Sequence, residues 1–278
     1  MLPYVRTYRL GSYLLSGLVA AAVLFTIAFY SGGTENLFSS PVGWLGVFAA
    51  FFIPNLFVTH YVNKAATKHT QRLSNIFDQH CDPALFIEKG RSIAHEIVKR
   101  PPIGEWGSKF LSNYCTALID QGIRDEAHHC LAEIYRSAQT AKSPKTRYEL
   151  YMSLYAPTKD LYGLDLAEEC LVKAQEIVNG DPVLSRFEDL GLTAWAHLVL
   201  NAEKTGNIEA LIKQYEQILT NESQLPRLRV WAAYKAASLY EMLGEEVQEA
   251  LLLHYVIERG NTMSCVAAAQ NKLARFVR

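Results

Sequence analysis

The chain of 278 residues carries 27 Lys and Arg against 28 Asp and Glu, which gives a formal net charge of −1, and half of its residues are hydrophobic. A protein that binds nucleic acid strongly usually has a basic excess or a basic stripe, so this balance argues against nucleic acid as a partner. The cysteines are odd in number and scattered: Cys81, Cys115, Cys130, Cys170 and Cys265. They predict buried free thiols in a reducing compartment and not a disulfide framework.

Two long uncharged apolar runs, Leu10–Tyr30 and Val42–Val62, stand at the start of the chain. At about 1.5 Å per residue either run makes a helix of roughly 31 Å, close to the ~30 Å hydrocarbon core of a bilayer. We therefore expect two transmembrane helices that form a hairpin anchor within residues 1–64. A cleaved signal peptide is the alternative for the first run. Its apolar stretch exceeds the usual ~7–15 residues, however, and a second run follows directly.

The basic residues beside these runs predict their orientation. Arg6 and Arg9 precede the first run, and the short loop that connects the runs has no Lys or Arg. Lys64, Lys68 and Arg72 follow the second run. Because Lys and Arg near span ends stay on the cytoplasmic side, both the N-terminus and the large C-terminal domain are expected in the cytoplasm, with the protein in the cytoplasmic membrane.

No Asp, Glu, Lys or Arg lies within either run, so the usual marker of an ion or proton pathway is missing. Asn55, Thr59 and His60 are the polar residues at the far end of the second run. Thr59 and His60 lie where polar side chains reach the cytoplasmic interface. We therefore expect an anchor in contact with the lipid bilayer and not a transporter.

After Asn63 the apolar residues follow helical spacing, which predicts an all-α fold. Asp82 before Pro83 is typical of an N-cap and a first helical residue, so a helix is expected from Pro83 toward Lys99, within a connecting segment of residues 65–103. Glycines and prolines divide the rest of the chain. Turns are expected at Gly122, Pro144, Pro157, Gly163, Gly180–Pro182, Gly206, Pro226, Gly244 and Gly260.

A pattern recurs about every 40 residues in this part of the chain, which indicates stacked helix pairs. Each copy has a small or apolar residue, a bulky one four later and an apolar one three beyond. The copies are Ala127/Leu131/Ile134, Ala167/Leu171/Ala174, Leu211/Tyr215/Ile218 and Ala250/His254/Ile257.

These residues resemble the second helix of the tetratricopeptide repeat, together with a turn glycine about five residues before it. Gly122 and Gly206 fit that position, whereas Gly244 falls one residue early and Gly163 one late. The period exceeds the family's 34 residues, His254 replaces a bulky apolar residue, and the terminal proline of the family is absent. The resemblance implies a protein-binding solenoid over residues 104–278 that ends in a capping helix, and a bacterial inner-membrane location.

The first helix of each pair would line the groove of such a solenoid. The candidate groove residues are Asn113, Tyr114, Tyr148, Tyr151, His197, Asn201 and Tyr234. We therefore expect a membrane-anchored scaffold that binds a protein or peptide at the cytoplasmic face of the membrane. The alternative is an accessory subunit of an integral membrane complex whose main contacts are made by the two transmembrane helices.

Signals of catalysis are poor. His95 and Glu96 begin a zincin-like pattern, but Lys99 stands where the second histidine is needed. His128–Cys130 and His80–Cys81 contain zinc donors, but neighbouring residues on a helix point about 100° apart and cannot share one metal unless others converge. No phosphate-binding loop, dinucleotide fingerprint or nucleophile elbow occurs. We expect no enzyme, no cofactor, no metal and no small-molecule substrate.

Overall fold

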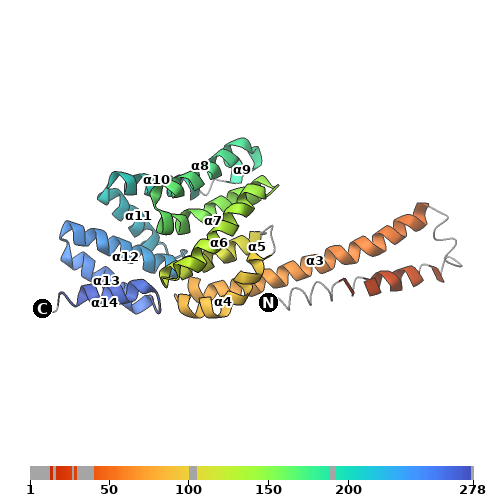
Figure 1. Ribbon diagram of the computed structural model, residues 1–278, viewed down its shortest axis with the longest axis horizontal. Coiled ribbons are helices and arrows are strands. Elements are labelled where there is room, and N and C mark those ends of the chain that lie inside the picture. The colour runs from red at the N-terminus through yellow and green to blue at the C-terminus, as the bar shows by residue number, and fades with distance from the viewer. Residues whose placement is uncertain are drawn as a thin grey trace. The chain divides into compact units, whose positions relative to one another are not determined.

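The computed structural model describes residues 13–14, 17–26, 28–29, 41–99, 105–187 and 192–276. Over these residues the chain is helical apart from short connections and contains no strand, which confirms the predicted all-α class (Figure 1). The chain divides into two compact units, Met1–Thr70 and Gln71–Arg278. Arg6, Arg9 and the loop between the two apolar runs, on which the predicted orientation partly rests, lie outside the described residues.

In the first unit, residues 17–26 are helical. The 38-residue helix α3 (Pro41–Asp78) starts in this unit and continues into the second one. Ala20 is completely buried, whereas many large apolar side chains of this unit are exposed. The exposed ones include Leu18, Phe25, Phe29, Trp44, Leu45, Phe48 and Leu56. Within the described part of the chain, no helix combines the length and the apolarity that crossing a membrane requires. Parts of the predicted span Leu10–Tyr30, and the side chains of Asn55 and Thr59, lie outside that part.

The second unit is a helical repeat-like stack in which neighbouring helices pack on each other, with α10 packed on α8 and α11. It begins with the end of α3 and with α4 (Pro83–Val98). Four helix pairs follow: α5 (Glu105–Asp120) with α6 (Arg124–Thr140), α7 (Pro144–Tyr162) with α8 (Leu164–Gly180), α10 (Leu192–Thr205) with α11 (Ile208–Thr220), and α12 (Pro226–Leu243) with α13 (Glu246–Arg259). The short helix α9 (Pro182–Phe187) and the last helix, α14 (Ser264–Leu273), complete the unit.

Local sequence signals explain several of the helix ends. The Asp82 side chain accepts a hydrogen bond of 3.0 Å from the Leu85 backbone amide, which confirms the predicted N-cap of α4. Gly122, Gly206 and Gly244 have φ of 74°, 65° and 73°, so the turns inside three helix pairs use left-handed backbone that glycine adopts without steric cost.

The prediction of a turn at Pro157 was wrong, because α7 continues through this proline. A proline inside a helix has no N–H to donate to the carbonyl four residues earlier, here that of Ser153. The Ser112 hydroxyl of α5 donates a hydrogen bond of 2.8 Å to this Ser153 oxygen. The neighbouring helix therefore supplies the donor that Pro157 removes.

The predicted core triplets of α6 and α8 are buried, and those of α11 are buried or half-buried. In α13 the register was wrong by one residue, since Glu249, Leu253 and Val256 are buried and His254 is exposed. Gly244 lies five residues before Glu249, as Gly122 and Gly206 do before the first core residues of α6 and α11. The sequence pattern missed this register because Glu249, a charged residue, occupies the first core position of α13.

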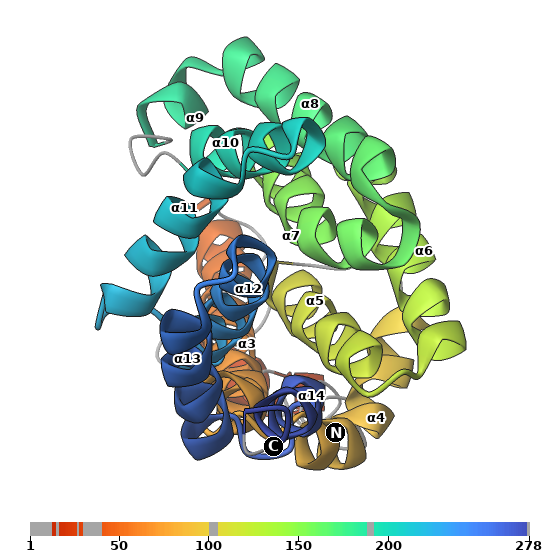
Figure 2. The ribbon, with the colours of Figure 1, turned by 90° about the vertical axis from the view of Figure 1, so that its left-hand side faces the viewer.

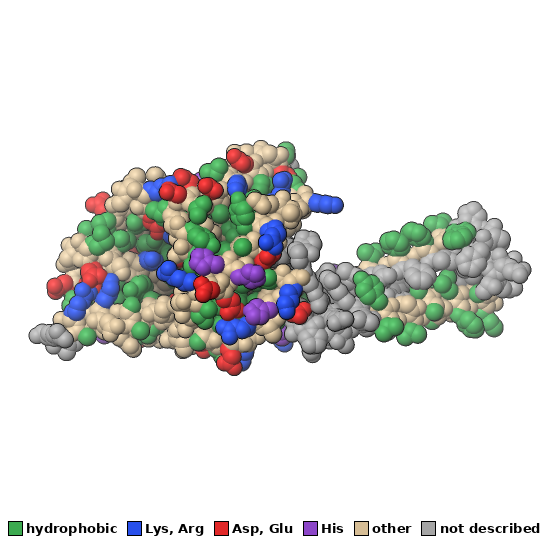
Figure 3. All heavy atoms as spheres, viewed as in Figure 1, with side chains coloured by type: hydrophobic (Ala, Val, Ile, Leu, Met, Phe, Trp, Pro, Cys, Tyr) green, Lys and Arg blue, Asp and Glu red, His purple; other side chains and the backbone are tan. Residues whose placement is uncertain are grey.

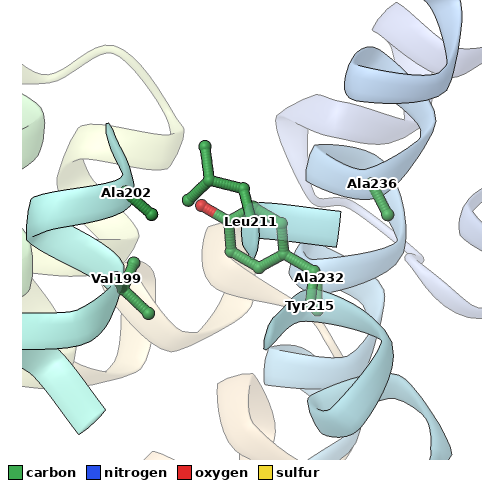
Figure 4. Close-up of a cluster of buried hydrophobic side chains, with 6 residues drawn as sticks. All are labelled: Val199, Ala202, Leu211, Tyr215, Ala232 and Ala236. Atoms are coloured by element: carbon green, nitrogen blue, oxygen red, sulfur yellow. The ribbon is translucent and has the colours of Figure 1, made fainter. Parts of the chain in front are cut away.

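Small and bulky side chains alternate where neighbouring pairs meet. Figure 4 shows one such cluster, with Leu211 and Tyr215 of α11 between α10 and α12. Their neighbours are Val199 and Ala202 of α10 and Ala232 and Ala236 of α12. The alanines lack bulk, so the helix backbones approach closely while one aromatic ring fills the space between them.

The two ends of the second unit are hydrogen-bonded to each other, and Figure 2 shows α14 beside α4. The residues that join them, here called the seam, are 80–82, 120–121 and 261–264. The Asn261 amide donates to the His80 carbonyl at 3.0 Å, and the Thr262 hydroxyl donates to Asp82 Oδ1 at 2.6 Å. Ser264 donates to Asp120 through both its backbone N–H, at 3.0 Å, and its hydroxyl, at 2.8 Å.

The backbone at the seam also has an uncommon conformation. Cys81 and Asn261 have φ of 53° and 49°, and they are the non-glycine residues with positive φ among the described residues. Left-handed backbone is sparsely populated outside glycine, and asparagine tolerates it better than most residues. The turn at Cys81 and the turn at Asn261, which meet at the seam, therefore both contain left-handed backbone.

A polar cluster ties the same two ends together inside the unit. Arg227 Nε of α12 donates to Asp78 Oδ1 at 2.9 Å, and both side chains are nearly buried. The Asn113 amide donates to Asp78 Oδ2 at 3.0 Å, while the Arg227 guanidinium lies 4.5 Å from the centre of the Phe77 ring. A buried ion pair repays desolvation only when its remaining polar groups are hydrogen-bonded, and Asn113 bonds both members of this one. The Phe77 ring adds a cation–π contact to the guanidinium.

We expect Arg227→Ala to lower the free energy of unfolding by about 3 kcal/mol, because it leaves the Asp78 carboxylate nearly buried and without its cation. Urea unfolding of the full chain, followed by circular dichroism, measures the change. Lys213→Ala is the control, since Lys213 is exposed on α11 and its loss should change stability by less than about 0.5 kcal/mol. Equal urea midpoints for the two variants would contradict the assigned role of the ion pair.

Candidate functional site

Two of the predicted groove residues belong to the core. Tyr114 is completely buried against Phe86 and Phe110, and its hydroxyl donates a hydrogen bond of 2.7 Å to Glu126. Tyr151 is 7% exposed and packs edge-to-face on Tyr135 at 6.3 Å. Both belong to first helices, as predicted, but on the side that faces neighbouring helices. They offer almost no surface to a partner.

The other predicted groove residues differ in what they can still contact. Asn113 is bound to Asp78 in the polar cluster described above, and the Tyr148 hydroxyl lies 3.2 Å from Thr193 Oγ1. Tyr234 is half-buried, with the Lys272 ammonium 5.6 Å from its ring centre. His197 is half-buried and Asn201 is exposed, both on α10. Asn201 is therefore the predicted residue with the most accessible side chain.

The structure brings together a group of charged and aromatic side chains that the sequence did not single out. Trp231 of α12 has two ammonium groups 5.6 Å from its ring, those of Lys159 on α7 and Lys235 on α12. Lys159 also forms an ion pair of 2.8 Å with Glu203 of α10. Three first helices thus contribute to one site, which we call the lysine–tryptophan cluster and define as Lys159, Asp160, Glu203, Trp231 and Lys235.

The charges of the lysine–tryptophan cluster are balanced but unequally exposed. The Lys159–Glu203 pair is largely buried, with 11% and 18% of the two side chains accessible. Asp160 is exposed, although the surrounding protein withholds enough water to raise the pKa of its carboxyl group. Lys159 and Lys235 oppose this rise, and Glu203 adds to it. Asp160 and Lys235 are the charges that remain available to a ligand.

The other candidate metal and thiol groups do not come together. His129 is exposed, His128 is half-buried with its Nδ1 2.6 Å from the Tyr162 hydroxyl, and Cys130 is buried. Among the described residues, no three His, Cys, Asp or Glu side chains are placed to hold a metal ion. Burial raises the pKa of the Cys81 and Cys265 thiols to about 11 and about 12, so both stay protonated at neutral pH.

A wide, shallow hollow of about 480 Å³ lies at the seam. Asp120, Gln121, Thr262, Ser264 and Gln270 line part of it. Asp120 and Thr262 are engaged in the hydrogen bonds that hold the seam closed. The hollow is therefore the outer surface of a structural contact.

No family model, curated protein or solved structure matches the chain. On the face of the second unit drawn in Figure 3, acidic and basic side chains are interspersed and do not separate into fields of one sign. The lysine–tryptophan cluster is thus the strongest polar candidate for a contact with another molecule on the first helices.

We expect Asp160 to titrate above the value of about 3.9 that is usual for aspartate, because burial disfavours its charged form. A carboxylate with a raised pKa loses its stabilising contribution as the pH rises through that pKa. Asp160→Asn should therefore gain stability relative to the unmodified protein between pH 3 and pH 6, as measured by urea unfolding. Lys235→Gln is the companion variant, and carbon NMR should then show a further upward shift of the Asp160 pKa. A stability difference that is independent of pH would contradict this description of the site.

Proposed function

We propose that this protein is a membrane-tethered scaffold whose second unit holds a protein or peptide partner at the cytoplasmic face. The observation that carries the proposal is the lysine–tryptophan cluster, to which three first helices contribute. An exposed carboxylate, a half-buried ammonium group and an aromatic ring within one site suit a polar peptide segment. Asn201 extends the accessible surface on α10.

The first unit supplies the tether in this proposal. Its exposed apolar side chains, among them Leu18, Phe25 and Leu56, are 65–75% accessible. Many large apolar side chains exposed to water in one unit indicate a partner that covers them. We propose that lipid covers it, and that the exposed Lys64 and Lys68 meet anionic headgroups on the cytoplasmic side.

The alternative is an accessory subunit of an integral membrane complex, in which another membrane protein covers the first unit. Exposed aromatic side chains in α3 favour it, since Trp44 is 57% accessible and Phe48 and Phe52 stack on each other at 4.6 Å. Rigid aromatic groups are enriched at protein contacts. The two candidates differ in which unit recognises the partner.

Replacing residues 1–64 with an unrelated membrane anchor separates the two functions. We expect the chimaera to retain its partner in crosslinking within membranes, followed by mass spectrometry, because the second unit makes the contact. Asp160→Lys in the otherwise unmodified chain should reduce capture at least about tenfold, since it reverses the accessible charge of the cluster. Loss of the partner from the chimaera, together with full capture by Asp160→Lys, would favour the accessory subunit.

A further inference from the structure

The last helix pair of the second unit exposes an unusual amount of apolar surface. Met242 and Leu243, at the end of α12, are 69% and 49% exposed. Val247 and Leu251, which lie one turn apart on α13, are 72% and 61% exposed. We call these four side chains the α13 patch.

The other second helices have polar residues at the positions that Val247 and Leu251 occupy. The register follows from the first core residue of each second helix: Ala127, Ala167, Leu211 and Glu249. Two residues before it, the other helices carry Asp125, Asp165 and Glu209, and two residues after it they carry His129, Glu169 and Lys213. All six are exposed, as Val247 and Leu251 are. The same solvent-facing positions are therefore polar in three helices and apolar in α13.

The end of the first helix shows the same difference. Counted back from the turn glycine, Met242 and Leu243 correspond to Asp120 and Gln121 in α5, and to Lys204 and Thr205 in α10. In α7 the same count from Gly163 gives Leu161 and the exposed Tyr162, so the difference holds for two of the three other pairs. Among the four helix pairs, α12 with α13 is the pair in which all four of these positions are apolar, and they lie around one turn. Exposed apolar side chains are common singly, but a group of them marks a contact surface.

The charge beside the α13 patch is negative. Glu245 and Glu246 lie in the turn that separates the two halves of the patch, and both are exposed. Two cations from α14 and the residues after it pair with other carboxylates: Lys272 with Glu241, and Arg275 with both Glu241 and Glu249. An acidic rim repels anionic lipid, and it would repel the same patch on a second copy across a twofold axis. It attracts a basic partner.

We propose that the α13 patch is a docking face for an amphipathic helix of a partner protein that carries basic residues beside its apolar stripe. Apolar side chains at helical spacing would cover Val247 and Leu251, and Lys or Arg would meet Glu245 and Glu246. This inference rests on the proposed scaffold function and adds a second contact on the outer surface, apart from the lysine–tryptophan cluster.

Site-specific photo-crosslinking of the full chain in its native membranes tests the proposal. The photoreactive residue p-benzoylphenylalanine replaces Val247 or Leu251, and the controls carry it at His129 or Glu169, the exposed positions of α6 and α8 that are equivalent to Leu251. We expect a discrete product from the first two positions and none from the controls. The crosslinked segment, mapped by mass spectrometry, should have apolar residues at intervals of three and four and a net positive charge.

Reversing the charges of Glu245 and Glu246 tests whether they attract the partner, and the readout is the yield of the same crosslinked product. Glu245→Lys with Glu246→Lys should reduce the yield from position 247 at least about fivefold, and Glu245→Gln with Glu246→Gln should reduce it less. All four replacements lie at exposed positions, and circular dichroism verifies that the helices are retained.

Four outcomes would overturn the inference: a product with a second copy of this chain, a product with lipid, an acidic captured segment, or equal yields at the equivalent positions 251 and 129. A photoreactive residue at Asn201 separates these failures from that of the scaffold. Capture from position 201 without capture from position 247 removes the docking face alone. No capture of a protein from either position removes both proposals.

Discussion

The ion pair between Arg227 and Asp78 joins the first and the last parts of the second unit, and the surface that this unit presents depends on it. A stack of helix pairs that ended freely would leave its first helices open along their length. Here α12 reaches the end of α3, while the seam holds α14 against the turn before α4. The nearly buried ion pair contributes more to the free energy of closure than the seam does, because the seam hydrogen bonds are mostly exposed to water.

Closure decides which residues remain for other molecules. Asn113 is occupied by Asp78, and Tyr114 and Tyr151 are packed into the core, so the part of the groove predicted on α5 and the start of α7 is used within the chain. The lysine–tryptophan cluster remains accessible through Asp160, which is exposed near the end of α7. The α13 patch takes no part in the seam or in the polar cluster around Arg227, so closure places no demand on its residue types. The two proposed contacts thus occupy surface that the fold does not need.

Much of the fold was predictable because its signals are local. The Asp82 cap, the turn glycines and the buried triplets of α6 and α8 each follow from a few neighbouring residues. The errors arose where a distant residue overrides a local signal. Pro157 does not end α7, because Ser112 supplies a hydrogen-bond donor to the carbonyl of Ser153.

The register of α13 and the site itself needed three-dimensional information. Glu249 occupies a core position because Arg275, from beyond α14, pairs with it at 3.0 Å, and no spacing within α13 indicates that partner. The lysine–tryptophan cluster joins residues of α7, α10 and α12 that are far apart in the sequence. The sequence could name side chains on first helices as candidates for the groove, but the rotational phase of each helix decides which of them pack against a neighbouring helix. A phase error of one residue exchanges core for surface.

Closure of the second unit is the central claim of this account, and one distance measurement tests it. Spin labels at Lys89 of α4 and Gln270 of α14, both exposed, report the separation of the two ends by pulsed electron paramagnetic resonance. The account predicts one narrow distance distribution in the full chain, at the short separation of helices that meet at the seam, and a broader one in Arg227→Ala. A broad distribution centred at long distance in the unmodified chain, unchanged by Arg227→Ala, would contradict closure.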